Sequence, residues 1–315
     1  MTQVHDFGAF LGLEGEACAP SARGVVVPVP YEATTTYMKG TADGPSAILT
    51  ASRQVEFWDE WIEDEAKRFG VRTLPAVEFD GPPDQLAEHL EKLIGSLLDQ
   101  KRFPLVLGGE HSLSLGPIRA AARRHPDMVV LHLDAHPDLR DCYEGTRYGH
   151  GCVMRRVVEA GVRVHAFGLR AISPEERDFY RAGGQGGLAS YVGARELLAL
   201  DPPGRVRRIL DGLPGGPVWL SWDIDGMDSS VVPSTGTPEP GGVDWYTACE
   251  VLRQLDQTGR LILGAELLEL MPREGHHASD FACARLAHRM LVTGLRSQER
   301  ATAHAPLQAA RADGR

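Results

Sequence analysis

The sequence lacks three features that would each assign it to a particular class of protein. Its five cysteines are scattered and form no Cys-x-x-Cys pair, so we expect neither a disulfide framework nor a structural zinc site. It has no apolar run long enough to cross a bilayer, and no basic segment followed by an apolar one at its N-terminus. It also lacks an excess of positive charge: the net charge of −10 argues against nucleic acid and anionic membrane as partners. These absences favour a cytoplasmic protein.

What the sequence does contain is an alternation of apolar strand patterns with amphipathic helix patterns. The expected strands cover residues 24–30, 71–79, 103–107, 128–133, 162–168, 218–222 and 261–268. The expected helices cover residues 84–98, 112–124, 149–160, 174–182, 244–255 and 279–292. Alternation of this kind predicts an α/β fold, with a central, mainly parallel sheet covered by helices on both faces.

No linker rich in Pro, Gly or Ser divides the chain, so we expect a single domain over residues 1–315. The Gly-rich stretch 182–187 is short and lies within the alternating pattern, which indicates a surface loop. Residues 1–23 are expected to form an N-terminal extension. Residues 296–315 are rich in Ala, Arg and Gln without apolar periodicity, which predicts a flexible tail.

Three of the expected strands end at clusters of histidine and aspartate. The strands are 103–107, 128–133 and 218–222, and each is apolar throughout, as in a parallel sheet buried on both faces. In open α/β sheets, ligands bind just beyond the carboxyl ends of the strands. The sequence therefore predicts a metal site whose candidate ligands are His111, Asp134, His136, Asp138, Asp223 and Asp225.

Spacing within these clusters supports a site for two ions. Residues two apart in an extended segment point the same way, so Asp134, His136 and Asp138 can share one side, as can Asp223 and Asp225. Four carboxylates this close would repel one another unless cations lay between them. Two divalent ions would balance their charge, with some carboxylates bridging, as in two-metal hydrolytic sites. Oxygen-rich ligation favours a hard ion such as manganese, although the Irving–Williams order lets zinc or nickel occupy purified protein.

At these residues the chain resembles the ureohydrolases, the arginase and agmatinase family, from about residue 25 to 295. Residues 108–112 (Gly-Gly-Glu-His-Ser) are similar to the family's first metal motif and residues 134–138 (Asp-Ala-His-Pro-Asp) to its second. Residues 221–228, continuing to 235–242, are similar to its third, and residues 39–48 to its N-terminal Gly-x-x-x-Gly-Pro-x-x-Ile element. The resemblance implies a three-layer, arginase-like α/β/α fold, two Mn²⁺ ions per subunit and hydrolysis of a guanidine to urea and an amine.

The resemblance also implies a division of the ligands between the two ions. One ion would be held by His111, Asp134, Asp138 and Asp223. The other would be held by Asp134, His136, Asp223 and Asp225. Asp134 and Asp223 would then bridge the two ions.

The resemblance places the family's catalytic histidine at His150 and its guanidinium-binding glutamate at Glu269. An imidazole suits proton transfer to the leaving amine because its unperturbed pKa lies near 6.5, and Asp138 is the other candidate donor. The carboxylate of Glu269 could form a bidentate pair with the planar guanidinium. We expect Thr237 to bind substrate and to support Glu269 by a hydrogen bond.

The segment after the second metal motif bears on the substrate. Arginases carry an Asn directly after the last Asp of this motif; here Leu139 follows Asp138, so the segment resembles the agmatinase branch. Asp141 and Glu144 would suit a cationic tail, as in aminopropylagmatine. Arg140 and Arg147 would suit a carboxylate tail, as in guanidinobutyrate, or in formiminoglutamate, which would release formamide. By resemblance, agmatine is the favoured substrate. Its hydrolysis would give putrescine and urea, a step of polyamine biosynthesis.

Two rival classes of function remain. A non-catalytic regulatory subunit of the family would be expected to lose ligands, whereas this chain keeps all of them. A metal-dependent amide deacetylase of a distantly related fold would need a different pattern of His and Asp around its metal. The resemblance suggests a homo-oligomer, either a trimer or a hexamer.

Four residues outside these motifs invite attention. Ser229 stands where the family usually has Pro, and it touches no expected ligand. His276 and His277 are expected to lie on a solvated loop rather than in an accessory metal site. His132 lies inside a strand, so we expect it to be a core residue and not a ligand.

Overall fold

The computed structural model describes the fold of residues 8–312, with side-chain detail as far as residue 303. One sheet of eight strands runs through it in the order β4-β1-β5-β10-β9-β6-β7-β8, and every pairing in it is parallel. The strands are β1 (Gly24–Val29), β4 (Val71–Thr73), β5 (Phe103–Gly108), β6 (Val129–Leu133), β7 (Arg163–Leu169), β8 (Ala189–Gly193), β9 (Val218–Asp223) and β10 (Ile262–Leu268). The predicted α/β/α fold class is confirmed.

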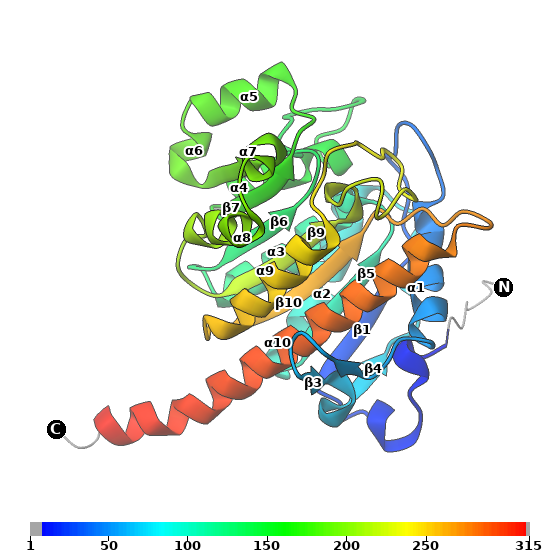
Figure 1. Ribbon diagram of the computed structural model, residues 1–315, viewed down its shortest axis with the longest axis vertical. Coiled ribbons are helices and arrows are strands. Elements are labelled where there is room, and N and C mark those ends of the chain that lie inside the picture. Colours follow the sequence, from blue (N-terminus) through cyan, green and yellow to red (C-terminus); the bar gives the residue numbers. More distant parts are fainter. Residues whose placement is uncertain (1–7, 313–315) are drawn as a thin grey trace.

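Helices cover both faces of the sheet, as Figure 1 shows. On one face the sheet packs against α1 (Gly44–Ser52), α8 (Pro202–Asp211), α9 (Trp245–Gln257) and α10 (His277–Ala312). On the other it packs against α2 (Pro83–Asp99), α3 (Leu115–Arg124) and α4 (Val153–Glu159). Shorter helices complete the layers, namely α5 (Pro174–Arg181), α6 (Gly184–Gly187) and α7 (Ala194–Leu198).

The strand β5 illustrates why the central strands are apolar throughout. Leu105 and Leu107 belong to the core under α10, whereas Val106 between them belongs to the core under α2 and α3. Successive side chains of a strand point to opposite faces, so both sets are buried when helices cover both faces. Complete burial of such an aliphatic side chain contributes roughly 1.5–3 kcal/mol. The two cores therefore hold the strand ends in place from both sides.

Several elements differ from those expected from the sequence. The edge strand β8, the helices α1, α7 and α8 and a small hairpin of β2 (Trp58–Asp59) and β3 (Asp64–Glu65) were not expected. The strand expected over residues 71–79 ends at Thr73. The Gly-rich stretch forms the short α6, two of whose residues have non-helical backbone angles. β8 lies at the edge of the sheet, and β2, β3, α6 and α7 have five residues or fewer, so hydrophobic periodicity identifies them poorly.

The C-terminal segment is helical where a tail was expected. The helix α10 continues past the predicted end at residue 292 to Ala312. Ser297 on this helix is buried and accepts a hydrogen bond from Ile262 N–H at 3.0 Å, and Arg300 donates to Asp256. Tertiary contacts on β10 and α9 thus order a stretch that has no clear apolar stripe of its own. Residues 1–7 of the expected extension and residues 313–315 of the expected tail lie outside the described residues.

Among the described residues, no helix has the combination of length and apolar character needed to span a membrane. Eight of the ten strands in the described residues belong to one sheet. The single domain over residues 1–315 stays a prediction.

The contact between α10 and β5 leads to a prediction about stability. Gly294 lies directly on the ring of Phe103, and a Cβ atom at this position would overlap Cε2 and Cζ of that ring. We expect Gly294→Val to lower the free energy of unfolding by about 1–3 kcal/mol, the usual cost of overpacking a core. Ala301→Val, at an exposed position of the same helix, is the matched control and should cost less than about 1 kcal/mol. Equal urea-denaturation midpoints for the two variants would contradict this packing.

Candidate metal centre and active site

The predicted site residues lie at the carboxyl ends of four strands that are neighbours in the sheet. The order β5-β10-β9-β6 places these strands side by side although they come from distant parts of the sequence. His111 follows β5, Asp223 ends β9, and Glu269 follows β10 directly. Asp134 follows β6 directly, with His136 and Asp138 after it. The sheet therefore brings the separate motifs to one edge, as predicted.

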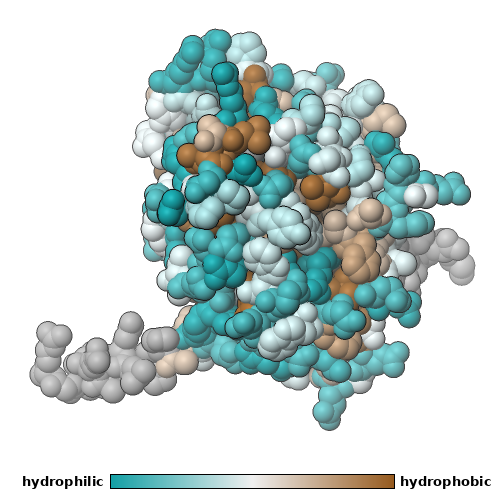
Figure 2. All heavy atoms as spheres, viewed as in Figure 1, coloured by the Kyte–Doolittle hydropathy of each residue, from teal (hydrophilic) through white to brown (hydrophobic). Residues whose placement is uncertain are grey.

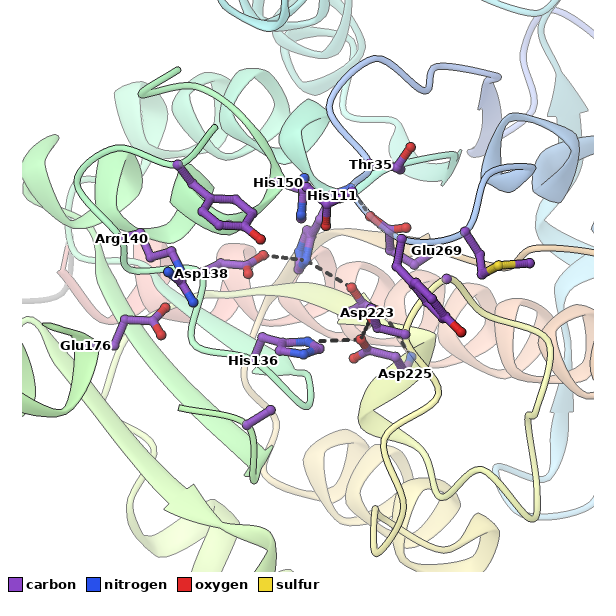
Figure 3. A pocket seen from close by; sticks show the side chains of 18 residues that line it. Thr35, His111, His136, Asp138, Arg140, His150, Glu176, Asp223, Asp225 and Glu269 are labelled. Carbon is purple, nitrogen blue, oxygen red and sulfur yellow. Dashed lines mark hydrogen bonds and ion pairs between the residues drawn. The ribbon is translucent and has the colours of Figure 1, made fainter. Parts of the chain in front are cut away.

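A pocket opens at this edge (Figure 3). Five of the six predicted ligands line it, and the sixth, Asp134, is completely buried beside them. His150, Glu269 and Thr237 also line it. The remaining walls come from residues 35–38, Arg140, Tyr143, Gly151, Ala171, Glu176 and Gly236. The structure thus brings together every residue that the sequence placed in the site.

His111 forms the inner part of the candidate metal centre. Its Nδ1 atom lies 3.2 Å from Asp134 Oδ2, 3.2 Å from Asp138 Oδ2 and 3.4 Å from Asp223 Oδ2. This nitrogen is buried and, among the described residues, no group forms a well-aligned hydrogen bond with it. Its Nε2 atom lies 3.0 Å from Ser221 Oγ, which accepts the Nε2 hydrogen when Nδ1 binds a cation. Three carboxylate oxygens around one ring nitrogen form a natural site for a divalent ion.

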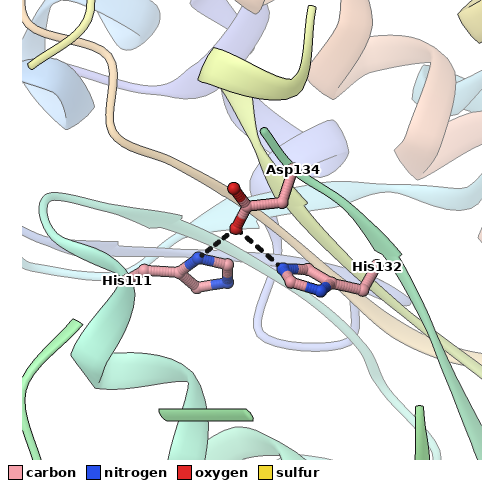
Figure 4. Close-up of side chains that lie close together, drawn as sticks. All are labelled: His111, His132 and Asp134. Carbon is pink, nitrogen blue, oxygen red and sulfur yellow. Dashed lines mark hydrogen bonds and ion pairs between the residues drawn. The ribbon is translucent and has the colours of Figure 1, made fainter. Parts of the chain in front are cut away.

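A second cluster of ligand atoms lies next to the first and shares Asp134 with it. The ligand atoms of Asp134, His136 and Asp225 all lie within 4.8 Å of one another. His136 Nδ1 is 3.0 Å from Asp225 Oδ2 and 3.5 Å from Asp134 Oδ1. On its other side, Asp134 belongs to a group with His111 and His132 (Figure 4). This arrangement suits a carboxylate that contacts two ions.

The electrostatics of the site show a shortage of positive charge. Burial and the charge of Asp134 raise the pKa of Asp138 to about 7. Burial and the charges of Asp225 and Asp134 raise the pKa of Asp223 well above its usual value. Burial alone would lower the pKa of His136, but the carboxylates of Asp225 and Asp134 outweigh it and raise the pKa to about 12. Each shift indicates that cations belong among these carboxylates, so the residues present fit a centre for two divalent ions.

Two of the site carboxylates stand on strained backbone. Asp138 has φ of 53° and Glu269 has φ of 65°, both in the left-handed region that residues with a Cβ rarely adopt. Such a conformation costs roughly 1–3 kcal/mol and persists only where the surroundings impose it. At Asp138 the next residue, Leu139, donates its N–H to the buried carboxylate of Glu176. At Glu269 the backbone N–H donates to Gly109 O at 2.8 Å. Both turns direct a carboxylate into the pocket.

The position of Thr237 corrects one sequence prediction. Its hydroxyl was expected to support Glu269, but it donates to Asp225 Oδ2 at 3.1 Å. Glu269 accepts its hydrogen bond from the His111 backbone N–H, at 2.7 Å. The loop that carries Thr237 pairs with the segment after β10, at Thr235 and Leu270, but the Thr237 hydroxyl donates to Asp225 after β9. The predicted Thr237–Glu269 hydrogen bond is therefore wrong. Thr237 still lines the pocket beside the second cluster.

His150 begins the short 3-10 helix His150–Cys152 and lines the pocket (Figure 3). Its Nδ1 atom lies 3.1 Å from Thr34 Oγ1. The ring of Tyr143 meets the His150 ring edge-on, at 5.8 Å between centroids and 82° between planes. Burial lowers the pKa of His150, which the charge of Glu110 partly opposes. Burial thus disfavours the charged form of this imidazole.

Two further sequence-based assignments concern histidines that were not expected to be ligands. His132 is buried within β6, as expected, but its Nε2 atom lies 2.8 Å from Asp134 Oδ2 and it belongs to a group that could hold a metal ion, so its exclusion from the ligands stays a prediction. His276 and His277 are exposed, and His277 Nδ1 lies 3.7 Å from Asp280 at the start of α10. The metal-capable clusters of the described residues lie elsewhere, so the solvated loop is the better description.

The charged residues considered for the substrate tail occupy different places. Arg140 lines the pocket and lies over the Tyr143 ring, 4.6 Å from its centroid. Asp141 is instead bound by Arg147 at 2.8 Å and Arg156 at 2.7 Å, outside the pocket lining. Glu144 is exposed. Of these residues only Arg140 reaches the pocket.

Sequence reasoning missed Glu176, a buried carboxylate in the pocket wall. It completes a capping box with Ser173 at the start of α5. The Ser-Pro-Glu-Glu segment is a recognisable signature of such a box, and it could have located the residue. Nothing in the signature shows that the glutamate also faces a pocket.

Comparison with known proteins agrees with this geometry. The model of the Arginase family matches residues 22–293. The chain is 36% identical to the N(1)-aminopropylagmatine ureohydrolase of Synechocystis sp., covering 90% of this chain and 92% of that protein. It is 30% identical to the agmatinase of Bacillus cereus, covering 85% and 90%. The crystal structure of the agmatine ureohydrolase of Thermoplasma volcanium has the same fold, with a TM-score of 0.76 at 23% identity and 97% of each chain covered. The chain belongs to the arginase family.

Proposed function

We propose that this arginase-family hydrolase releases urea from a guanidino compound with a polyamine tail. The observation that carries the proposal is the convergence of two histidines and four aspartates with Glu269 and His150 on one pocket. Agmatine is the first candidate substrate, which would give putrescine. Aminopropylagmatine is the second, and the relative that is 36% identical over 90% of the chain is a ureohydrolase of that compound.

The ligand assignment that we propose follows the two clusters. His111, Asp134, Asp138 and Asp223 would hold one ion, and Asp134, His136, Asp223 and Asp225 the other. The oxygen-rich donor set favours manganese. Two ions held there would supply a nucleophile at neutral pH, because a bound divalent ion lowers the pKa of water.

Glu269 is proposed to bind the guanidinium group. Burial and the charges of Asp223 and Glu110 raise the pKa of its carboxyl group well above the usual value. A bound guanidinium would supply the missing positive charge and can donate two parallel hydrogen bonds to a carboxylate. One oxygen of Glu269 already accepts the His111 N–H, which holds the carboxylate in place at the pocket wall.

His150 is proposed to deliver the proton that the leaving amine needs. Hydrolysis adds the elements of water across a carbon–nitrogen bond, and the amine cannot leave as an anion. A neutral imidazole takes up a proton and passes it to the amine nitrogen. Asp138, whose carboxyl also lines the pocket, is the alternative donor.

A cytoplasmic location and assembly into trimers or hexamers remain predictions. The first rests on the amino-acid composition, and the second on family resemblance. The alternative of a non-catalytic regulatory subunit is disfavoured because the proposed ligands and both proposed catalytic groups are present and close together.

Removing a proposed bridging ligand tests the metal centre. We expect Asp223→Ala to abolish urea release and to lower the bound metal well below two ions per subunit, because both ions would lose a ligand. Metal content by plasma mass spectrometry and urea release should be measured on the same sample. Asp211→Ala, at an exposed position, is the control. Activity near the wild-type level in Asp223→Ala would exclude the dinuclear assignment.

Two further variants separate proton transfer from substrate binding. His150→Ala should keep its metal and lose about 10²–10⁴-fold in kcat, the usual contribution of general acid–base catalysis. Glu269→Gln should also keep its metal but raise KM as well as lowering kcat, because it removes the charge that pairs with the guanidinium. Loss of metal from His150→Ala, or unchanged kinetics in Glu269→Gln, would show that these roles belong to other residues.

A substrate panel tests the tail. Initial rates of urea release should be compared for agmatine, aminopropylagmatine, arginine and guanidinobutyrate with the manganese-loaded protein. We expect the two polyamine-type substrates to have the highest kcat/KM. Because Arg140 reaches the pocket, guanidinobutyrate is the informative competitor. If it were the best substrate, the assignment of a polyamine tail would be wrong, although the ureohydrolase reaction itself would stand.

A further inference from the structure

Thr34 connects the proposed proton-transfer residue to a buried carboxylate that the proposed reaction does not use. Its hydroxyl Oγ1 donates to Glu110 Oε1 at 2.8 Å. The same oxygen lies 3.1 Å from His150 Nδ1 and accepts the His150 backbone N–H at 3.1 Å. Thr34 is 76 residues from Glu110 and 116 residues from His150 in the sequence, and it does not line the pocket. Only folding brings these three residues into contact.

Glu110 acts as an acceptor on both of its carboxylate oxygens. Oε2 accepts the backbone N–H of Ala33 at 2.6 Å and that of Thr34 at 2.5 Å, and a backbone N–H can only donate. Oε1 accepts the hydroxyl of Thr34, and also that of Ser112. The side chain is completely buried, so solvent does not compete for these bonds. The single hydroxyl hydrogen of Thr34 is thereby committed to Glu110.

This commitment determines which nitrogen of His150 carries the hydrogen. A hydroxyl has one hydrogen and two lone pairs. With its hydrogen directed at Glu110, Oγ1 of Thr34 can only accept from His150, through the backbone N–H and through Nδ1–H. In the neutral ring the lone pair then lies on Nε2. Among the described residues, none makes a hydrogen bond with Nε2, and His150 lines the pocket.

The packing around Gly149 supports the same arrangement. A Cβ atom at Gly149 would come 3.1 Å from Thr34 Oγ1 and 3.3 Å from Thr34 Cβ. Such a Cβ atom would push the Thr34 hydroxyl away from His150. The absence of a side chain lets Thr34 reach both the backbone and the ring of His150. The edge-on contact of Tyr143 then restricts rotation of the ring from another side.

We propose that Thr34, held by Glu110, is a positioning residue that fixes His150 with hydrogen on Nδ1 and the lone pair of Nε2 open to the pocket. The inference rests on the proposed function, because it concerns the proton-transfer step of that reaction. The attacking water contributes its hydroxyl to the guanidine carbon and its proton to the leaving nitrogen. His150 takes that proton at Nε2 and releases it there, and Nδ1–H keeps its bond to Thr34 throughout.

Substitutions at Thr34 that keep or remove the hydroxyl test the proposal. Thr34→Val keeps the shape and removes the hydroxyl, so kcat with agmatine or aminopropylagmatine, whichever the wild type hydrolyses, should fall about 10–100-fold, as for other orienting partners. KM and manganese content should change little. Thr34→Ser restores the hydroxyl and should recover most of that loss. Thr41→Val is the matched control: it removes a hydroxyl that donates to Glu32 in the same segment but touches neither His150 nor the pocket.

A double variant asks whether Thr34 acts through His150. In the His150→Ala background, Thr34→Val should cause no further loss, because the ring that it positions is gone. An additional loss in the double variant, loss of manganese from Thr34→Val, or equal defects in Thr34→Val and Thr34→Ser would each overturn the proposal. A wild-type protein that releases no urea would refute the proposed function instead. Wild-type turnover in Thr34→Val, beside a defective His150→Ala, would refute this inference alone.

Discussion

The site depends above all on four carboxylates that are buried at close range on one edge of the sheet. Asp134, Asp138, Asp223 and Asp225 are each at most 5% exposed. Backbone N–H groups satisfy part of the hydrogen-bonding capacity of these carboxylates. The N–H groups of His136, Asp225 and Ala135 each donate to one of them. Hydrogen bonds satisfy lone pairs but leave net negative charge, and like charges out of water repel strongly. Cation binding and the stability of this edge are therefore linked.

The parallel sheet explains why such an edge can be built at all. Each of β5, β6 and β9 is buried on both faces, so two hydrophobic cores determine where its last residue lies. Packing in those two cores stabilises the fold by roughly 1.5–3 kcal/mol for each fully buried aliphatic side chain. This stabilisation offsets the clustered charge and the backbone strain at the site. The strained turns at Asp138 and Glu269 are small against that total. A rigid scaffold thus supports both clustered charge and backbone strain.

The parts of the site that the sequence could predict are those carried by local motifs. Asp134 and Asp223 each follow an apolar run directly, and His111 follows one after a short Gly-Gly-Glu turn. The rule that ligands bind at the carboxyl ends of parallel strands predicts that these residues share one edge. The hydrogen bond of Thr237 was predicted wrongly because Asp225 and Glu269 follow neighbouring strands, and sequence alone does not show to which of the two carboxylates the hydroxyl donates. β8 escaped prediction because an edge strand of five residues has little hydrophobic pattern. The end of α10 escaped because contacts with β10, and not its own periodicity, keep it helical.

The turn after β5 contacts several of the proposed functional groups. Glu110 and His111 are adjacent in the chain, but their side chains contact different parts of the site. His111 faces the carboxylates of the candidate metal centre, while Glu110 holds the segment that contacts His150, 116 residues from Thr34 in sequence. Since the backbone of His111 also donates to Glu269, this one turn touches the proposed metal, proton-transfer and guanidinium groups. A displacement of the turn would disturb all three together, so the alignment of nucleophile, proton donor and substrate rests on how firmly β5 is packed.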